Sequence, residues 1–380
     1  MFKAGGLSQV QDFQHGLKCL GSNPALKLRT EKGIGSEVNS ERRTRREFLR
    51  PRAVRLPDGP FRLIRAGRPA MAGIFEVVIR SENRGYLEAV HLALNRDQEL
   101  EAKLSFFRED SDLGRVNRLA AEGPVRVGRD CFEIISKAVD LGEATSGAFD
   151  ISAGPLWRCW GFHRRQGQMP ESEEIAEALQ RVGFRWIELN AGEGTVRLNR
   201  QGMEINLGSI GKGYALDRAA DELRKSGLPA ALLHAGYSSM VAWGDSWRPG
   251  SGWRVEIAHP WLPSAAIARL RLQNQALATS GLSQQFFEHE GKRYGHILDP
   301  RTGWPVENRA VVSVVAPEAA QADALATAFF ILSPEEIDEF CKRDSEIGAL
   351  VVEEGDGGSL LYQRFGSLKE STRERLEVEE

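Results

Sequence analysis

Short strand-like segments follow one another along most of this chain, and few helical segments separate them. Their β-branched and aromatic content is typical of strands, and hairpin-like spacings separate many of them. A regular βαβ fold would need a helix after nearly every strand. The pattern therefore predicts an α+β fold with largely antiparallel sheets. The expected strands lie in 73–80, 185–190, 195–199, 203–207, 231–236, 253–260, 266–281, 311–317 and 348–354.

Helical periodicity is clearest in three segments, 86–104, 131–147 and 214–227. In the first, apolar residues recur at steps of three and four, which places them on one face of a helix. The second segment is expected to stop at Gly147 and the third at Gly227, because glycine commonly follows the last residue of a helix.

Length and composition exclude several classes of protein. The chain has 380 residues, 41% of them hydrophobic and 27% charged, which is typical of a globular protein with ample core. Its net charge of −3 gives no reason to expect nucleic acid or an anionic membrane as a partner. Its four cysteines contain no C-x-x-C pair, and no apolar run is long enough to cross a bilayer, so we expect no transmembrane segment.

The first 66 residues form a basic extension rich in Gly, Ser, Pro and Arg. Within it, 44–50 (TRREFLR) resembles a twin-arginine export motif. Export also needs an apolar segment downstream, whereas 51–69 carries five further arginines. We therefore expect a cytoplasmic protein, with periplasmic export through the twin-arginine motif as the alternative. The predicted globular domain is 67–366, and 367–380 is a polar tail.

The junction 205–217 (INLGSIGKGYALD) runs from an apolar stretch through a glycine-rich turn into a helical pattern. Backbone N–H groups and the positive end of the helix dipole bind anions at such a junction. The order Gly208, Gly211, Lys212, Gly213 matches neither the Walker spacing nor the dinucleotide spacing, which argues against a P-loop kinase. Taken alone, the junction predicts an anion site of unspecified kind.

Asp323 and Thr327 lie four residues apart in ADALATAFFIL, so on a helix they share one face. Their side chains could present two hard oxygens to one cation. An Asp beside so many apolar residues needs a partner. A helix cap or a solvated face explains the pair equally well, and the residues alone leave both interpretations open.

His296 precedes the turn sequence 299–303 (DPRTG) at the end of a strand-like segment. Beside a turn that binds a ligand, His296 would be a candidate general base. A structural histidine is the alternative.

The segment 146–162 (SGAFDISAGPLWRCWGF) is rich in aromatic side chains. It could pack in a core or contact a flat aromatic ligand. Near it in sequence, Asp110-Ser111 in 105–118 could cap a short helix.

The order and spacing of these segments resemble the ApbE family, the flavin transferases that take FMN from FAD and attach it to a threonine of a target protein. H-x-x-D-P-x-T-G-x-P followed by A-D-x-x-x-T is specific to the family. The resemblance covers Met71 to Gly366 and implies a T-fold-like α+β fold, with two α/β lobes around largely antiparallel sheets and the active site between them. The matching segments are 105–117, 147–162, 206–217, 279–281, 296–305 and 322–328.

The resemblance implies a magnesium ion held by Asp323, Thr327 and the backbone carbonyl of Ser209. Lys212 would then face the pyrophosphate of FAD, and His296 would be the base for the incoming threonine hydroxyl. AMP would leave, and entry of water would hydrolyse FAD to FMN and AMP as a side reaction. The implied contacts to FAD are Met71, Phe107, Ala148, Phe149, Asp150, Asn206, Lys212 and Ile297.

Three departures from the family pattern stand out. Gly236-Tyr237-Ser238-Ser239 replaces the usual G-G-D/N, Asn206 replaces a common Asp, and Phe107 replaces a common Tyr. We expect these changes to alter the flavin pocket rather than the metal pair. They keep open the alternative of a non-catalytic protein that binds or carries FAD. The chain has no obvious acceptor motif, so the acceptor is expected to be another protein.

Overall fold

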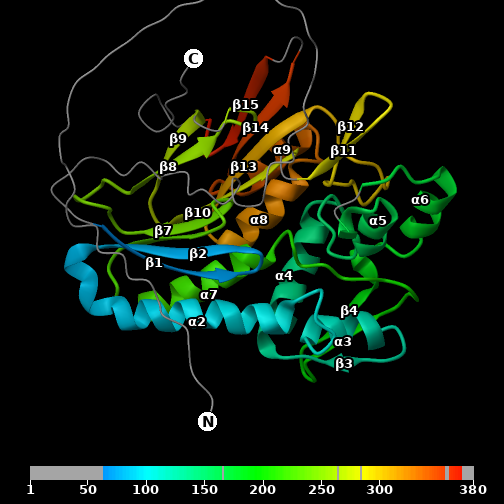
Figure 1. Cartoon of the computed structure of the whole chain (residues 1–380), viewed down its shortest axis with the longest axis horizontal. Coiled ribbons are helices and arrows are strands. Elements are labelled where there is room, and N and C mark those ends of the chain that lie inside the picture. Colours follow the sequence, from blue (N-terminus) through cyan, green and yellow to red (C-terminus); the bar gives the residue numbers. More distant parts are fainter. Residues whose placement is uncertain (1–62, 165–166, 263–264, 283–284, 356–358, 370–380) are drawn as a thin grey trace, which may run out of the picture. The chain divides into compact units, whose positions relative to one another are not determined.

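The computed structural model describes residues 63–164, 167–262, 265–282, 285–355 and 359–369 (Figure 1). The twin-arginine-like motif and most of the polar tail lie outside these residues. The first described strand, β1, already begins at Leu63, ahead of the expected start of the domain. Among the described residues, none of the helices is long and apolar enough to span a membrane.

An eight-stranded sheet forms the centre of the fold, and each of its strands pairs antiparallel with its neighbours. This arrangement confirms the α+β class and the antiparallel sheet predicted from the strand pattern. In order of pairing, the strands are β1 (Leu63–Ala70), β2 (Gly73–Arg80), β6 (Ala231–Ala235), β7 (Ser239–Trp243), β10 (Gln275–Gly281), β13 (Arg309–Ala316), β14 (Gly348–Glu354) and β15 (Leu360–Gly366).

The helices that contact this sheet include α2 (Leu87–Leu104), α7 (Gly211–Lys225) and α8 (Ala319–Ala328). Figure 1 shows α2 running alongside β1 and β2. Helix α7 contacts α2, α8, β6 and β7, and α8 contacts β10 and β13. The buried apolar side chains of these helices join those of the sheet in one hydrophobic core. Helix α9 (Pro334–Arg343) contacts β15.

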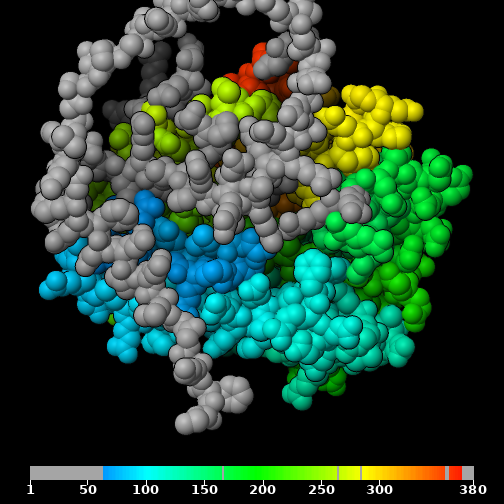
Figure 2. All heavy atoms as spheres, in the orientation of Figure 1, coloured from blue at the N-terminus to red at the C-terminus, as the bar shows by residue number. Residues whose placement is uncertain are grey.

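A smaller, mainly helical part carries a three-stranded sheet, β3-β5-β4, and the β11–β12 hairpin. Figure 2 shows the hairpin, in yellow, beside the green surface of the preceding helices. The buried indole of Trp160 joins the two, because it lies 5.8 Å from the ring of Tyr294 in the hairpin. The elements of this smaller part are α3 (Asp112–Leu119), β3 (Val125–Arg126), α4 (Arg129–Ala144), α5 (Gly154–Cys159), α6 (Ser172–Leu179), β4 (Ile187–Asn190), β5 (Thr195–Leu198), β11 (Phe286–His289) and β12 (Lys292–Gly295).

Local signals marked several helix ends, although the expected helices 131–147 and 214–227 begin earlier, at Arg129 and Gly211. Gly147 and Gly227 have φ angles of 82° and 87° and follow α4 and α7, as expected of residues after a helix. Ser111 caps α3 by accepting a hydrogen bond from the Gly114 N–H at 2.8 Å. The expected strand 266–281 is two strands, β9 (Ala266–Leu272) and β10, because the chain turns at Asn274 with φ of 55°.

The expected strand at 203–207 was wrong, since only Glu204 makes a bridge, to Ala153. The backbone of Ile205 bonds the side chain of Asn117 instead of a neighbouring strand. Its N–H lies 2.7 Å from Asn117 Oδ1, and its carbonyl accepts from Asn117 Nδ2 at 2.9 Å. A side chain therefore satisfies the backbone groups that a sheet would have paired.

Candidate functional site

The carboxylate of Asp323 lies at the meeting point of α7, α8 and β7. Asp323 is only 7% exposed. Its Oδ2 accepts the backbone N–H of Gly213 at 2.7 Å, and its Oδ1 accepts the hydroxyl of Ser239 at 2.5 Å. Because each carboxylate oxygen has two lone pairs, both oxygens keep one available for a further partner.

Close packing of α7 on α8 produces this geometry. A Cβ atom on Gly213 would lie 2.1 Å from the carbonyl oxygen of Ala319, so only glycine fits at that crossing. One turn further along α7, the carboxylate of Asp217 accepts the N–H groups of Ala319 and Ala320, both at 2.8 Å. Burial raises the pKa of Asp217 to about 7, and these two N–H donors oppose the rise. Asp217 thus caps α8 from a neighbouring helix.

Thr327 lies one helical turn after Asp323 on α8, and its hydroxyl is 3.4 Å from the Asp323 carbonyl oxygen. Burial raises the pKa of Asp323, while the positive charge of Lys212 and the bonds from Ser239 and Gly213 oppose the rise. The carboxylate and hydroxyl on one face are hard oxygen donors, which suits Mg²⁺. Nowhere among the described residues do three or more His, Cys, Asp or Glu side chains form a metal-binding group. A magnesium ion bound by one carboxylate and substrate phosphates does not need such a group.

His296 is held through its Nδ1 atom, which lies 3.0 Å from the carbonyl oxygen of Gln285. Its ring also meets that of Phe162 edge to face, with centroids 6.5 Å apart. Burial lowers the pKa of His296, the bond to Gln285 opposes the fall, and the positive charge of Lys212 adds to it. Lys212 therefore lies close enough to act on both His296 and Asp323, although the three residues are far apart in sequence.

The glycine-rich junction forms the turn into α7, as predicted. Ser209 lies in this turn and Lys212 in the first turn of the helix. Asn206 is bound within the junction, since its Oδ1 accepts the N–H of Gly208 at 2.8 Å. Its own N–H donates to the Ile151 carbonyl at 2.7 Å, which joins the junction to the aromatic-rich segment. Two of the segments that resemble the family, 206–217 and 147–162, therefore meet just before the start of α7.

The side chains expected along the nucleotide differ in exposure. Ala148 and Phe149 are each 1% exposed and belong to the hydrophobic core, and their contact with the nucleotide stays a prediction. The Oδ1 of Asp150 accepts the N–H and the hydroxyl of Ser152, both at 2.7 Å, and its Oδ2 accepts the N–H of Phe184 at 2.8 Å. Burial raises the pKa of Asp150, and these bonds oppose the rise. Asp150 thus holds its own loop in place.

Three further positions expected to contact FAD lie apart along the chain. Met71 and the next residue, Ala72, have φ angles of 47° and 60° and form the two-residue turn between β1 and β2, which is unusual for residues other than glycine. Phe107 is 76% exposed and meets Phe106 edge to face at 5.3 Å. Ile297 is buried, and its carbonyl accepts the Val306 N–H at 3.0 Å. The contacts of these residues with FAD stay predictions.

One expectation about the departures from the family pattern was wrong. They were expected to leave the metal pair unaffected, yet Ser239 donates directly to Asp323. Tyr237 turns away from this site and stacks on the ring of His234, with centroids 4.3 Å apart. Sequence reasoning also missed Gln285 as the partner of His296. A serine that follows a turn and begins a short apolar segment, 239–243 (SMVAW), was the available signal for Ser239.

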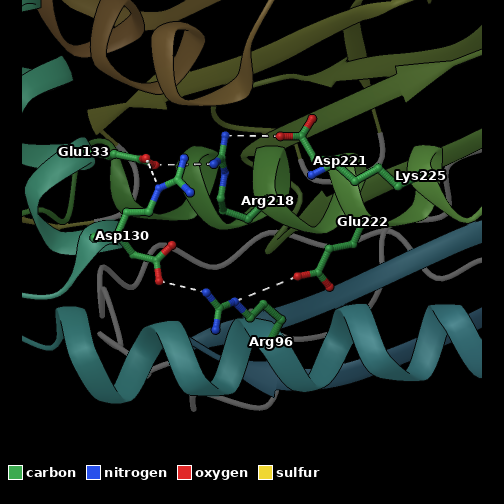
Figure 3. A pocket seen from close by; sticks show the side chains of 8 residues that line it. Arg96, Asp130, Glu133, Arg218, Asp221, Glu222 and Lys225 are labelled. Atoms are coloured by element: carbon green, nitrogen blue, oxygen red, sulfur yellow. Dashed lines mark hydrogen bonds and ion pairs between the residues drawn. The ribbon is translucent and has the colours of Figure 1, made fainter.

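A charged groove of about 230 Å³ lies elsewhere, between α2, α4 and α7 (Figure 3). Its charges pair with one another: Arg96 on α2 lies 2.9 Å from Asp130 on α4, and Arg218 on α7 lies 3.4 Å from Glu133 on α4. The groove therefore offers little unbalanced charge to a ligand, and its ion pairs join the three helices. Its lining residues, which include none of the predicted site residues, are Arg96, Arg129, Asp130, Glu133, Arg218, Asp221, Glu222 and Lys225.

Comparison with known proteins identifies the family of this chain. A sequence profile of the ApbE family matches residues 71–351. The chain therefore belongs to the ApbE family. Solved structures of ApbE proteins share its fold. An ApbE protein from Thermotoga maritima has a TM-score of 0.73 and 28% identity, and the match covers 81% of this chain and 98% of that one. The apo flavinyl transferase ApbE of Pseudomonas stutzeri has a TM-score of 0.72 and 27% identity, and the match covers 83% of this chain and 98% of that one.

Three curated relatives share the name FAD:protein FMN transferase. That of Treponema pallidum is 32% identical over 283 residues, which cover 69% of this chain and 77% of the relative. That of Escherichia coli K12 is 30% identical over 275 residues, covering 71% and 77%. That of Haemophilus influenzae is 29% identical over 285 residues, covering 72% and 82%.

Proposed function

We propose that this protein transfers FMN from FAD to a threonine hydroxyl of another protein, with Mg²⁺ bound and AMP released. The names of the curated relatives support flavin transfer. The observation that carries the proposal is the buried carboxylate of Asp323, which accepts the Gly213 N–H in the first turn of α7, where a helix N-terminus also favours anions.

Asp323, Thr327 and the backbone carbonyl of Ser209 would hold the magnesium ion. Bound there, Mg²⁺ would neutralise negative charge on the pyrophosphate of FAD. Lys212 supplies a second positive charge, and the start of α7 supplies backbone N–H groups. These groups bind the diphosphate and orient the bond that is to break.

His296 acts on the incoming threonine. The Gln285 carbonyl accepts a hydrogen bond from Nδ1, so the neutral ring keeps a lone pair on Nε2. The threonine hydroxyl gives its proton to Nε2 while its oxygen forms a bond to the phosphorus of the FMN phosphate. The bond from that phosphorus to the AMP oxygen breaks, and AMP leaves with the electron pair. Water in place of threonine gives FMN and AMP by the same route.

Mass spectrometry tests this function directly. The full chain is incubated with FAD, Mg²⁺ and a peptide that carries a threonine acceptor motif, and the peptide is expected to gain the mass of FMN as AMP appears. His296→Ala should slow transfer by about 10²–10⁴-fold while FAD binding persists. His289→Ala, an exposed histidine on β11, is the matched control. If FAD stays intact and AMP never forms, the protein is a carrier of FAD instead.

A further inference from the structure

We propose that Ser239 is a positioning residue, whose hydroxyl orients the Asp323 carboxylate for the metal. This inference rests on the proposed function, because it assumes that Asp323 binds Mg²⁺. Ser239 does not touch the metal or FAD in this proposal. It acts through Asp323 alone, by the 2.5 Å hydrogen bond to Oδ1.

The bond to Ser239 completes a two-point support of the carboxylate. Gly213 on α7 holds Oδ2, and Ser239 on β7 holds Oδ1. Two donors on different oxygens, from different elements, fix the plane of the group as well as its position. The remaining lone pairs stay free for a cation. With Gly213 alone, the carboxylate could rotate about its Cβ–Cγ bond.

Ser239 is itself held rigidly. It is fully buried and begins β7, where it pairs with Ala235 on one side and Ala278 on the other. The N–H of Thr279 donates to the Ser238 carbonyl at 2.7 Å, which ties the turn before β7 to β10. A hydroxyl on this backbone has little freedom to follow a carboxylate that moves, so it determines where Oδ1 lies.

The turn before β7 places the hydroxyl of Ser239 on the face of the sheet that meets Asp323. Gly236 and Tyr237 have φ angles of 58° and 61°, as the central residues of a tight turn. Tyr237 stacks on His234. His234 directly precedes Ala235 in β6, so its side chain points to the face opposite that of Ala235 and Ser239. The departure from the usual family sequence thus supplies the donor for the metal-binding carboxylate.

The test measures Mg²⁺ binding to the full-length chain by titration calorimetry, with the metal alone as probe. Ser239→Ala should weaken Mg²⁺ binding by about 10–100-fold, as loss of a partner of a metal ligand commonly does. Ser313→Ala is the matched control, because Ser313 is also fully buried but bonds Thr279 Oγ1 at 2.8 Å rather than Asp323. Ser239→Thr keeps the hydroxyl and should bind Mg²⁺ almost as well as the wild type.

Each outcome distinguishes the positioning role from the proposed function. If the wild type binds Mg²⁺, Asp323→Asn abolishes binding and only Ser239→Ala weakens it, the positioning role is supported. Unchanged affinity in Ser239→Ala, or equal losses in the Ala and Thr variants, would overturn the role while leaving the metal site intact. If Asp323→Asn binds Mg²⁺ like the wild type, the metal site of the proposed function fails, and the positioning role fails with it.

Discussion

The Nδ1 atom of His296 lies 3.0 Å from the carbonyl oxygen of Gln285. A carbonyl oxygen only accepts hydrogen bonds, so the ring must place a proton on Nδ1 to make this contact. In the neutral ring, Nε2 then carries the lone pair that a base needs. Without this partner, both tautomers of the neutral ring would be populated.

The pH profile of FMN transfer should reflect the pKa of His296. Burial and the charge of Lys212 lower this pKa below its ordinary value of 6.5. The neutral ring is the active base, so activity is lost only as pH falls through that lowered pKa. The acid limb of kcat/KM in the free enzyme should therefore lie below pH 6.5. Rates measured between about pH 5 and pH 8 test this, and an acid limb above 7 would contradict it.

Lys212→Met should change both binding and the pH profile. Loss of the charged partner of the pyrophosphate should raise KM for FAD by about tenfold or more. Loss of the positive charge beside His296 should also raise the pKa of that histidine, so the acid limb moves to higher pH. Lys225→Met, at the other end of α7, is the control and should change neither quantity. An unshifted acid limb in Lys212→Met would show that the two side chains do not interact.

Gly213→Ala should destabilise the protein. The higher helix propensity of alanine favours the variant by about 1 kcal/mol. The new Cβ, however, would lie 2.1 Å from the Ala319 carbonyl oxygen, which is backbone and cannot swing aside. We expect a net loss of about 1–3 kcal/mol in the free energy of unfolding, measured by urea denaturation. Gly85→Ala, where a Cβ meets nothing within 4 Å, is the control, and equal stability of the two variants would refute the steric argument.

Asp97 on α2 should make stability fall as pH rises. It is 1% exposed, and its Oδ1 has no hydrogen-bond partner within the described part of the chain. Burial, together with the negative charge of Glu222, raises its pKa from 3.8 to about 8. Between pH 3.8 and about pH 8, the folded state therefore keeps a proton that the unfolded state has lost. The free energy of unfolding falls as pH rises through this range and levels off above about pH 8.

The variant Asp97→Asn has no such proton to lose. Its stability relative to the wild type should therefore increase with pH, by an amount on the order of 1 kcal/mol per pH unit within that window. Urea denaturation at a series of pH values measures this difference. Asp140→Asn, on the exposed face of α4, is the control and should show no such trend. A difference that is independent of pH would mean that Asp97 is charged in the folded protein.

Periodicity and turn residues sufficed for much of the architecture. The alternation of short strands predicted the antiparallel sheet, and Gly227 and Ser111 marked helix boundaries correctly, whereas α4 already ends at Ala144, before Gly147. These features depend on neighbours within a few residues, which the sequence displays directly. The strand expected at 203–207 does not form, because the backbone of Ile205 bonds the side chain of Asn117, which lies 88 residues away in the chain. No local pattern contains that information.

The sequence by itself determined the ApbE family, the α+β class, and the helix face shared by Asp323 and Thr327. Only the tertiary structure decided which groups surround Asp323. Ser239 and Gly213 are 84 and 110 residues away from it in the chain, and they reach it because α7 packs tightly against α8 above β7. Tertiary packing also decided that Gln285 lies beside His296, and that the charge of Lys212 acts on His296 and Asp323. Local sequence sets the direction of a side chain relative to its own element, whereas packing sets what that side chain meets.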